Sequence, residues 1–358
     1  MATIQDVARL ANVSVSSVSN VLNGRNERMR EATYARIQQA IDKLGYRPSQ
    51  IARQLKTGHI PILGMLVPTT LNPSFGQLAV AVEEVARRKY DYRVLVCNTY
   101  RDKDVEATVL DELIGLGIRA VIVISSLNDE RHIEAAIDKG MAVVSYDLGI
   151  DPARPAKHDH VLPDNRLAGQ LAASHLIAHG HRHLAFVKPK GATISRREKI
   201  EGFMAAVQQS GQPCSTQIVD IDDGTRFGDN ELGQLGFRAA QQIAALEQRP
   251  TGVVAVNDMI AIGLMAGLRH CGLSVPEQVS VIGMDNVAMS EFAWPPLTTV
   301  ATPVPDVAET MVEQAIAHIR QPDLPPREFS FPPRLVERQS VAAPAGQASS
   351  AHAARKQS

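Results

Sequence analysis

The amino-acid sequence predicts an all-α domain at the N-terminus, followed by an α/β body of two lobes, each built on a doubly wound parallel sheet. The α domain follows from residues 3–24, which carry the apolar spacing of two short helices. The body follows from Ile62 onward, where short apolar runs alternate with helical stretches. About 280 residues of this alternation exceed what one open sheet holds, so we expect two lobes.

The first predicted helix begins at a capping box, in which Thr3 is followed three residues later by Asp6. Its apolar stripe has the helical spacing i, i+3, i+4, i+7 and consists of Ile4, Val7, Ala8 and Ala11. After a break at Asn12 and Val13, Ser14 caps a second helix, whose inward side chains are Val18, Val21 and Leu22. The opposite side of this helix carries Ser16, Asn20 and Asn23. This helix-turn-helix offers small hydrogen-bonding groups to the major groove of DNA.

A helical hairpin with merely solvated serines and asparagines is the competing interpretation. The segment, however, closely resembles the helix-turn-helix of the lactose/galactose/purine repressor family (LacI/GalR type), whose recognition core is similar to Val-Ser-x-x-x-Val-Ser-x-Val-Leu-Asn-Gly at residues 13–24. The resemblance implies a transcription factor that binds double-stranded operator DNA. The residues to which we assign DNA contacts are Thr3, Ser14, Val15, Ser16, Ser17, Asn20, Asn23, Leu55 and Lys56.

A third helix is predicted over residues 31–44, with Gly45 as its left-handed cap and Pro48 blocking any continuation. Arginines surround it and suit contacts with phosphates, namely Arg25, Arg28, Arg30 and Arg36. Residues 49–59 are too short to form a stable isolated helix and resemble the family's hinge helix. The resemblance implies that Leu55 wedges into the minor groove, whereas a role in the protein core is the alternative.

The distribution of charge supports this division. The 358 residues carry a net charge of −1, with 44% hydrophobic and 21% charged residues, which is typical of a globular protein. Residues 1–59 contain nine Lys and Arg against four Asp and Glu, so the rest of the chain carries −6. A basic head on an acidic body suits a small module that contacts phosphates.

Other signals are largely negative. Cys97, Cys214 and Cys271 lie far apart and read as thiols in a reducing compartment. No secretory signal and no apolar run of membrane-spanning length is present, so we expect a cytoplasmic protein without membrane contact. We find no Gly-x-Ser-x-Gly elbow, no Walker loop and no strand-linked Gly-x-Gly-x-x-Gly, and we predict neither an enzyme nor a cofactor. A metal interpretation of the histidines at 175, 179, 181 and 183 is weak because no carboxylate or thiol has suitable spacing.

The elements of the body are expected in chain order. The predicted strands are residues 62–67, 94–96, 120–124, 142–145, 184–187, 217–220, 253–256 and 279–282. The predicted helices are residues 78–88, 105–116, 133–138, 167–179, 199–210, 235–245 and 260–270.

A second segment, residues 164–182 with Asp-Asn-Arg-Leu-Ala-Gly and a later His-Gly-His-Arg, resembles the same family. Its effector domain is similar to type I periplasmic sugar-binding proteins, which implies a fold in which the chain crosses between the lobes near residues 160, 292 and 322. We therefore expect a helix-turn-helix domain at 1–48, a hinge at 49–59 and an effector-binding and dimerisation domain at 60–341. Within it, lobe one comprises about 60–160 and 292–322, and lobe two about 161–291 and 323–341. Residues 342–358 are low in complexity and are predicted to be a disordered tail.

Polar residues follow three predicted strands, where open α/β sheets bind ligands: Asp147, Asn257 with Asp258, and Asp285. Any one of them can be a cap or turn residue, and we expect Asp258 to be one. The family resemblance assigns effector contacts to Phe75, Asp147, Ser195, Lys199, Asn257 and Asp285. Two departures matter, since Lys199 replaces the family's usual arginine and Asn230 stands where some relatives stack an aromatic ring. Arg101 is a further candidate for an anionic group, with a surface role as the alternative.

We therefore predict a homodimeric repressor that responds to a small carbohydrate or sugar acid. Leu78, Val82, Val85 and Ala86 offer an apolar helix face for the dimer. The alternatives are a regulator that responds to a nucleobase or nucleoside, a cytoplasmic sugar-binding protein, and a sugar-modifying enzyme. The sequence does not name the effector, and it leaves open whether the effector releases the protein from DNA or recruits it.

Overall fold

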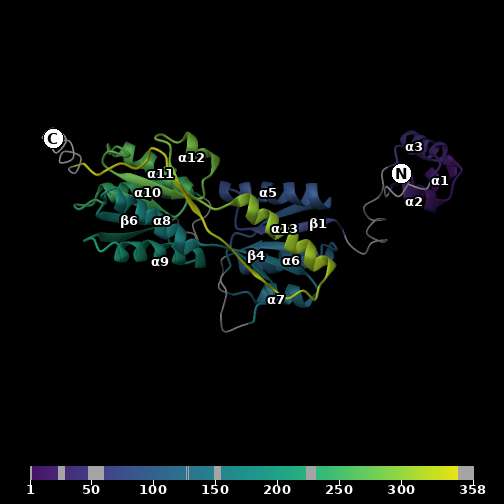
Figure 1. The fold of residues 1–358 in the computed structure, drawn as a ribbon, viewed down its shortest axis with the longest axis horizontal. Coiled ribbons are helices and arrows are strands. Elements are labelled where there is room, and N and C mark those ends of the chain that lie inside the picture. Colours follow the sequence, from purple (N-terminus) through teal and green to yellow (C-terminus); the bar gives the residue numbers. More distant parts are fainter. Residues whose placement is uncertain are drawn as a thin grey trace, which may run out of the picture. The chain divides into compact units, whose positions relative to one another are not determined.

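A computed structural model describes residues 2–22, 29–46, 60–125, 127, 129–148, 155–222 and 231–345 (Figure 1). The chain forms two compact units, Met1–Ile60 and Pro61–Ser358, which we call the head and the body. The predicted contact residues Asn23, Leu55 and Lys56 lie outside the described residues, as do Asn230 and the tail from residue 346.

The head contains helices α1 (Ile4–Ala11), α2 (Val15–Leu22) and α3 (Glu31–Leu44). The predicted capping box at α1 is confirmed, because the Asp6 N–H donates to Thr3 Oγ1 at 3.3 Å and the Thr3 N–H donates to Asp6 Oδ2 at 2.9 Å. Asn12 and Gly45 adopt the left-handed conformation that ends α1 and α3. A small apolar core joins the three helices and includes the fully buried Val7, Val18 and Ile37.

The body contains two six-stranded sheets, each of which defines one lobe. The sheet of lobe one has the order β11-β5-β4-β3-β1-β2 and is parallel throughout. Its strands are β1 (Ile62–Val67), β2 (Arg93–Asn98), β3 (Ala120–Ile124), β4 (Ala142–Tyr146), β5 (Asp159–Pro163) and β11 (Glu328–Phe331). The sheet of lobe two has the order β12-β10-β9-β8-β6-β7, in which only the edge strand β12 is antiparallel among the described strands. Its strands are β6 (His183–Pro189), β7 (Ser215–Ile221), β8 (Gly252–Ala255), β9 (Ser280–Met284), β10 (Thr298–Ala301) and β12 (Arg334–Val336).

Helices cover both faces of each sheet, as the alternating pattern predicts (Figure 1). In lobe one, α5 (Pro73–Tyr90) and α13 (Val304–Arg320) share one core, while α6 (Lys103–Gly115) and α7 (Arg131–Asp138) share the core on the other face. Lobe two carries α8 (Asn165–Ala178), α9 (Ile194–Gln209), α10 (Leu232–Ala244), α11 (Asp258–His270) and the short α12 (Ala288–Phe292), and it has one continuous core.

The second and third crossings between the lobes lie later than the expected residues 292 and 322. Strand β10 still pairs with β9 of lobe two, and β11 still pairs with β5 of lobe one, so the crossings lie near residues 302 and 332. These strands escaped prediction because β10 is only Thr-Thr-Val-Ala and β11 carries polar residues on its exposed side, so neither shows a buried apolar run.

Two further expectations are wrong. The helix face proposed for the dimer belongs to the core, because its α5 residues Leu78, Val82 and Ala86 are at most 3% exposed. The tail does not begin at residue 342, because the N–H of Ala342 donates to Ser280 Oγ at 3.0 Å. The Ala342 carbonyl accepts from the Ser280 hydroxyl at 3.1 Å, and its oxygen lies 2.9 Å from His181 Nε2.

Helices α8 and α9 can cross closely because each has a glycine where the two backbones meet, Gly169 on α8 and Gly202 on α9. A Cβ on Gly169 would lie 1.9 Å from the Lys199 carbonyl oxygen, and a Cβ on Gly202 would lie 1.9 Å from the Arg166 carbonyl oxygen. No other residue allows this backbone approach. The crossing sets the position of α9 in lobe two.

Candidate functional site

The outer side of α2 carries the predicted DNA-contacting residues. Val18 is fully buried, whereas Val15 is 42% exposed and Ser16 and Asn20 are also exposed. Ser14 caps the helix, since its Oγ accepts the Ser17 N–H at 3.1 Å. Ser14 also interacts with two neighbouring serines, because its Oγ lies 2.7 Å from Ser16 Oγ and 2.9 Å from Ser17 Oγ. The helix thus separates an apolar inner side from an outer side of small polar groups.

The exposed cations of the head are distributed over its helices. Arg9, at the end of α1, keeps 79% of its side chain exposed, and Arg30 and Arg36 are exposed at the start and middle of α3. Long flexible cations around a small polar helix can neutralise phosphates on either side of a groove. Thr3, a predicted DNA-contacting residue, also stabilises the fold, because its side chain takes part in the capping box.

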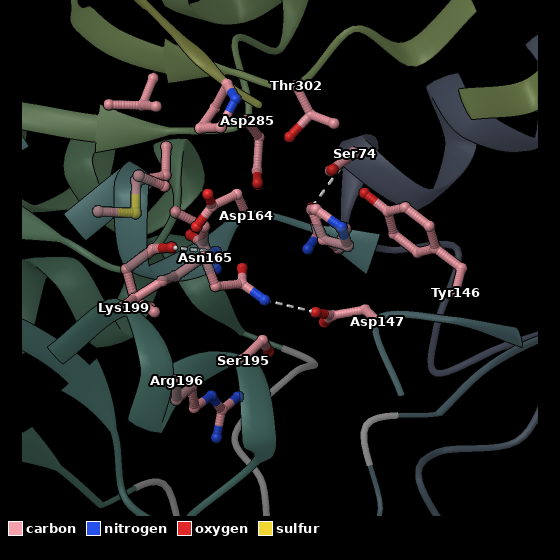
Figure 2. A pocket seen from close by; sticks show the side chains of 18 of the residues that line it. Ser74, Tyr146, Asp147, Asp164, Asn165, Ser195, Arg196, Lys199, Asp285 and Thr302 are labelled. Carbon is pink, nitrogen blue, oxygen red and sulfur yellow. Dashed lines mark hydrogen bonds between the residues drawn. The ribbon is translucent and has the colours of Figure 1, made fainter. Parts of the chain in front are cut away.

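The body contains a polar cleft between its two lobes, at the carboxyl ends of the parallel strands (Figure 2). All six residues predicted to contact the effector line it: Phe75, Asp147, Ser195, Lys199, Asn257 and Asp285. They come from positions up to 210 residues apart, and Arg101 lines the same cleft. The cavity volume is about 90 Å³, well below the roughly 300–1,000 Å³ typical of sites for drug-sized ligands, so a small metabolite suits it.

The wall from lobe one begins where β4 ends. Asp147 adopts a positive φ of 60° directly after the strand, which turns its backbone out of the sheet. One of its carboxylate oxygens accepts from Asn165 Nδ2 at 2.8 Å. Phe75 lies in the first turn of α5, after the N-cap Asn72. Tyr146 adds a second ring, and burial raises the pKa of its hydroxyl well above the usual range.

The wall from lobe two is built largely from the start of α9. Thr193 caps this helix by accepting the Arg196 N–H at 3.3 Å, and Ser195 and Lys199 follow within its first two turns. Lys199 Nζ donates to the Val256 carbonyl at 3.3 Å. The glycine-mediated crossing of α8 and α9 fixes the depth at which these polar side chains enter the cleft.

Asn257, which lines the cleft, and not Asp258, caps helix α11. Asn257 is the N-cap of α11, since its side-chain oxygen accepts the Ile260 N–H at 2.9 Å. Asp258 is fully buried and accepts from the Val287 N–H at 2.9 Å, the Ser290 hydroxyl at 2.6 Å and the Thr299 hydroxyl at 2.5 Å. The prediction that Asp258 caps the helix is therefore wrong.

This buried carboxyl instead ties the start of α11 to the segment after Asp285, at α12, and to β10. Asp285 adopts a φ of 121°, unusual for a residue other than glycine, and its N–H donates to the Val300 carbonyl at 2.9 Å. Burial raises the pKa of Asp285 to about 8, although the nearby Lys199 opposes the shift. Burial therefore favours the protonated form of this carboxyl, which can donate as well as accept a hydrogen bond.

Comparison with known proteins decides the family. Residues 3–49 match the bacterial regulatory proteins of the lacI family, and residues 173–341 match the periplasmic binding protein-like domain. The chain is 33% identical over 344 residues to the HTH-type transcriptional repressor PurR of Aliivibrio fischeri, with 95% of this chain and 98% of the relative covered. The chain belongs to the LacI family. It is a DNA-binding transcriptional regulator with an effector-binding domain.

Solved structures of LacI-family proteins share this architecture. A LacI family transcriptional regulator from Enterococcus faecium with bound ribose is 28% identical, with a TM-score of 0.68 over 79% of this chain and 99% of that one. The lac repressor dimer bound to operator and the anti-inducer ONPF is 22% identical, with a TM-score of 0.80 over 96% of this chain and 99% of that one. Because its identity is only 22%, the likeness to the lac repressor supports the fold alone.

Several residues of this LacI-family cleft were not singled out in the sequence. Asn165 begins α8 shortly after β5, whose sequence Asp-His-Val-Leu-Pro shows no apolar run, and Tyr146 is the last residue of β4, directly before Asp147. Arg196 and Thr302 also line the cleft (Figure 2). Position in the chain could have indicated these cleft residues, because each of them follows or ends a strand or lies at the start of a helix.

The histidines near the end of α8 have structural partners. His181 Nδ1 lies 3.0 Å from Thr251 Oγ1, and His183 Nδ1 lies 2.8 Å from Ser215 Oγ. Within the described ranges, no three His, Cys, Asp or Glu side chains are grouped as metal ligands. No helix in the described part of the chain has the length and apolar character needed to cross a bilayer.

Proposed function

We propose that this LacI-family regulator is a repressor that binds a pseudo-palindromic operator as a homodimer in the cytoplasm. A small sugar or sugar acid in the cleft between the lobes controls its operator affinity. The convergence of six residues from separate parts of the chain on one polar cleft carries the effector proposal. The family provides the DNA-binding half of the proposal.

The chemistry of the cleft favours a polyhydroxylated ligand. Carboxyl groups at Asp147 and Asp285 and the amide of Asn257 accept from or donate to hydroxyls, and Ser195 does both. Ribose occupies the related regulator from Enterococcus faecium, which supports a sugar here as well. The second candidate is a nucleobase or nucleoside, because Phe75 and Tyr146 provide rings on which a flat base can stack.

Gel-shift titration against DNA from the promoter of its own gene tests the DNA half. We expect specific binding by the full chain and none by a protein that lacks residues 1–59, since the helix-turn-helix lies in the head. Specific binding by the shortened protein would refute this assignment. Thermal-shift screening of the full chain with sugars, sugar acids and nucleosides tests the effector half, because a ligand at 100 times its dissociation constant adds about 2.7 kcal/mol of stability.

The homodimer requires a surface other than the buried face of α5. Four large apolar side chains of the body are 65–82% exposed, namely Leu71, Val80, Phe292 and Trp294. Leu71 also borders a groove with the apolar residues Phe237, Met259 and Ile262 of lobe two. A second copy of the chain would remove this apolar area from water, and the operator-bound relative is a dimer.

Analytical ultracentrifugation of Val80→Glu and Trp294→Glu tests this surface. Both variants should sediment as monomers at concentrations where the parent is a dimer, because association would bury an unpaired charge. Leu116→Glu is the matched control, since Leu116 is 52% exposed at the end of α6. Unchanged dimerisation of both variants would exclude the surface.

A further inference from the structure

The loop after β2 brings one more cation, Arg101, into the effector cleft. The residue is 6% exposed and lines the cleft from lobe one. Tyr100 and Arg101 both have left-handed backbone conformations, with φ values of 54° and 53°. Residues other than glycine keep such conformations where their surroundings hold them. The Tyr100 N–H is held by the Pro68 carbonyl at 2.8 Å, while its side chain is 59% exposed.

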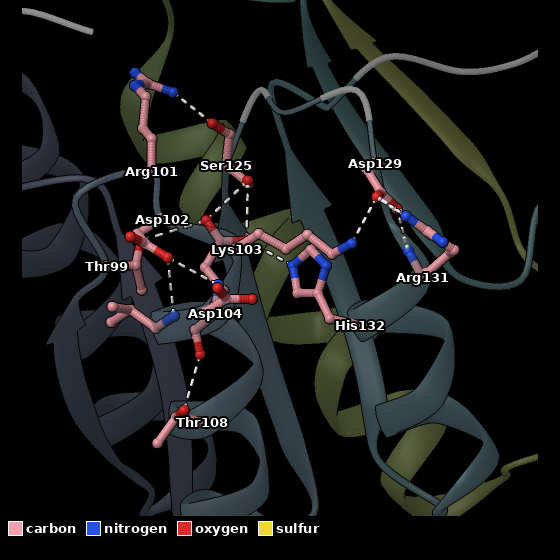
Figure 3. A network of polar contacts seen from close by, with 12 residues as sticks. Thr99, Arg101, Asp102, Lys103, Asp104, Thr108, Ser125, Asp129, Arg131 and His132 are labelled. Atoms are coloured by element: carbon pink, nitrogen blue, oxygen red, sulfur yellow. Dashed lines mark hydrogen bonds and ion pairs between the residues drawn. The ribbon is translucent and has the colours of Figure 1, made fainter. Parts of the chain in front are cut away.

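A buried polar network lies behind this loop (Figure 3). Its centre is the fully buried carboxyl group of Glu106 on α6. The Ser125 hydroxyl donates to its two oxygens at 2.9 and 3.1 Å, the Thr99 hydroxyl donates at 3.4 Å, and His132 Nε2 lies 2.7 Å away. The backbone carbonyl of Ser125 accepts from the Arg101 guanidinium. Glu106 thus holds Ser125, and Ser125 in turn orients Arg101.

This arrangement suits recognition of a carboxylate. The hydrogen bond to the Ser125 carbonyl helps to fix the plane of the Arg101 guanidinium. A guanidinium has five N–H donors in a rigid planar fork, and this fork matches the two oxygens of a carboxylate. Lysine offers only a point charge, so Lys199 on the other lobe does not duplicate this geometry.

The charges that line the cleft favour an anionic ligand. Three cations, Arg101, Arg196 and Lys199, share it with the carboxyl groups of Asp147, Asp164 and Asp285. Asp164 accepts the Leu167 N–H at 2.8 Å as the cap of α8, so part of its charge stabilises the helix. Burial raises the pKa of Asp285 to about 8. Burial therefore lessens the negative charge at Asp285, which favours an anionic ligand beside the cations.

On the basis of the proposed effector function, we propose that Arg101 binds a carboxylate of the effector and that the effector is a small sugar acid. Glu106 and Ser125 are positioning residues that orient the guanidinium. Arg101 belongs to lobe one, whereas Lys199 and Asp285 belong to lobe two. A sugar acid held at both ends would link the two lobes, so its differential affinity for the closed body can shift the conformational equilibrium.

Calorimetric titration of the full chain tests the assignment of Arg101. The probes are D-gluconate, D-glucuronate and D-galacturonate, each compared with the neutral D-glucose or D-galactose and with glucose 6-phosphate. We expect one of the acids to bind at least about tenfold more tightly than its neutral counterpart, and Arg101→Met to abolish this preference. Arg101→Lys should restore part of it, because it keeps the charge but not the fork. Arg131→Met is the matched control, since Arg131 lies in the same lobe with 75% of its side chain exposed and pairs with Asp129.

The positioning role is tested with Glu106→Gln and Ser125→Ala. Both should lower the preference for the acid over the neutral sugar and leave binding of the neutral sugar unchanged. A merely structural role would lower both affinities together. If Glu106→Gln does not fold, Ser125→Ala carries the test, because it removes one hydroxyl and keeps the carbonyl that accepts from Arg101.

The outcomes separate this inference from the proposed function. Tighter binding of neutral sugars, or an acid preference that survives in Arg101→Met, overturns the role of Arg101 while an effector site remains. Preference for glucose 6-phosphate over every carboxylate overturns the choice of a carboxylate. If no sugar, sugar acid, sugar phosphate or nucleoside binds or alters operator affinity, the proposed function itself fails.

Discussion

Replacing Gly202 by alanine tests how the fold positions the cleft. The added Cβ would lie 1.9 Å from the Arg166 carbonyl oxygen, whereas ordinary contact begins at 3.4 Å, so α8 and α9 would have to separate by about 1.5 Å. Arg166 is in the first turn of α8, so this oxygen belongs to backbone that cannot move aside alone. Overpacking of this kind costs about 1–3 kcal/mol, which exceeds the roughly 0.4–1 kcal/mol that Gly→Ala contributes within a helix.

The change should also reach the cleft. Ser195 and Lys199 precede Gly202 on α9, so a displaced helix moves both away from a bound ligand. Loss of one hydrogen bond to a charged group corresponds to about 1.5–3 kcal/mol, or roughly 10- to 100-fold in effector affinity. Gly169→Ala should behave similarly, because its Cβ would meet the Lys199 carbonyl oxygen at 1.9 Å.

Thermal unfolding and calorimetry of the effector complex measure the two effects. A domain of this size shifts its melting temperature by about 2–4 °C per kcal/mol. Gly115→Ala is the control, because a Cβ there meets no atom within 4 Å, and it should raise the melting temperature slightly. Gly202→Ala and Gly115→Ala should therefore change the melting temperature in opposite directions. A melting temperature for Gly202→Ala equal to or above that of the parent, with unchanged effector affinity, would refute the argument.

Three further predictions concern the head, the hinge and the pocket. Asn20→Ala should weaken operator binding by about 1–3 kcal/mol and relax the preference at one base pair per half-site in a selection assay; uniform weakening over all sequences would instead place Asn20 on a phosphate. Leu55→Ala should reduce operator affinity and DNA bending at an unchanged melting temperature, whereas a lower melting temperature with normal bending would return Leu55 to the core. Burial raises the pKa of Asp285 from its ordinary 3.8 to about 8, so the folded state retains an extra proton between these values. The free energy of unfolding should therefore fall as pH rises through this window, by at most about 1.4 kcal/mol per unit, and equal slopes for the parent and Asp285→Asn in urea titrations at pH 5, 6.5 and 8 would contradict it.

Local patterns in the sequence were sufficient for the elements whose stabilisation is local. The Thr3–Asp6 capping box, the left-handed cap at Gly45 and the apolar spacing of α1 to α3 all involve residues within about one helical turn. The buried strands β1, β3 and β8 were equally clear, because strands covered on both faces read as continuous apolar runs. The family resemblance identified six positions, five of them polar, that the fold then gathers into one cleft.

Only the tertiary structure decided which of two neighbouring residues, both able to cap a helix, takes which role. Asn257 and Asp258 can both cap α11, and Asp258 instead becomes buried because three donors from β10 and the segment at α12 meet it there. The apolar stripe of α5 indicates a buried face but not the partner that covers it, which is the sheet and α13 of its own lobe. Short polar strands such as β10 and β11 form because a neighbouring strand accepts their hydrogen bonds, and that neighbour lies far away in the sequence. Contacts of this kind depend on the packed chain as a whole, whereas local patterns report only what a residue and its nearest neighbours prefer.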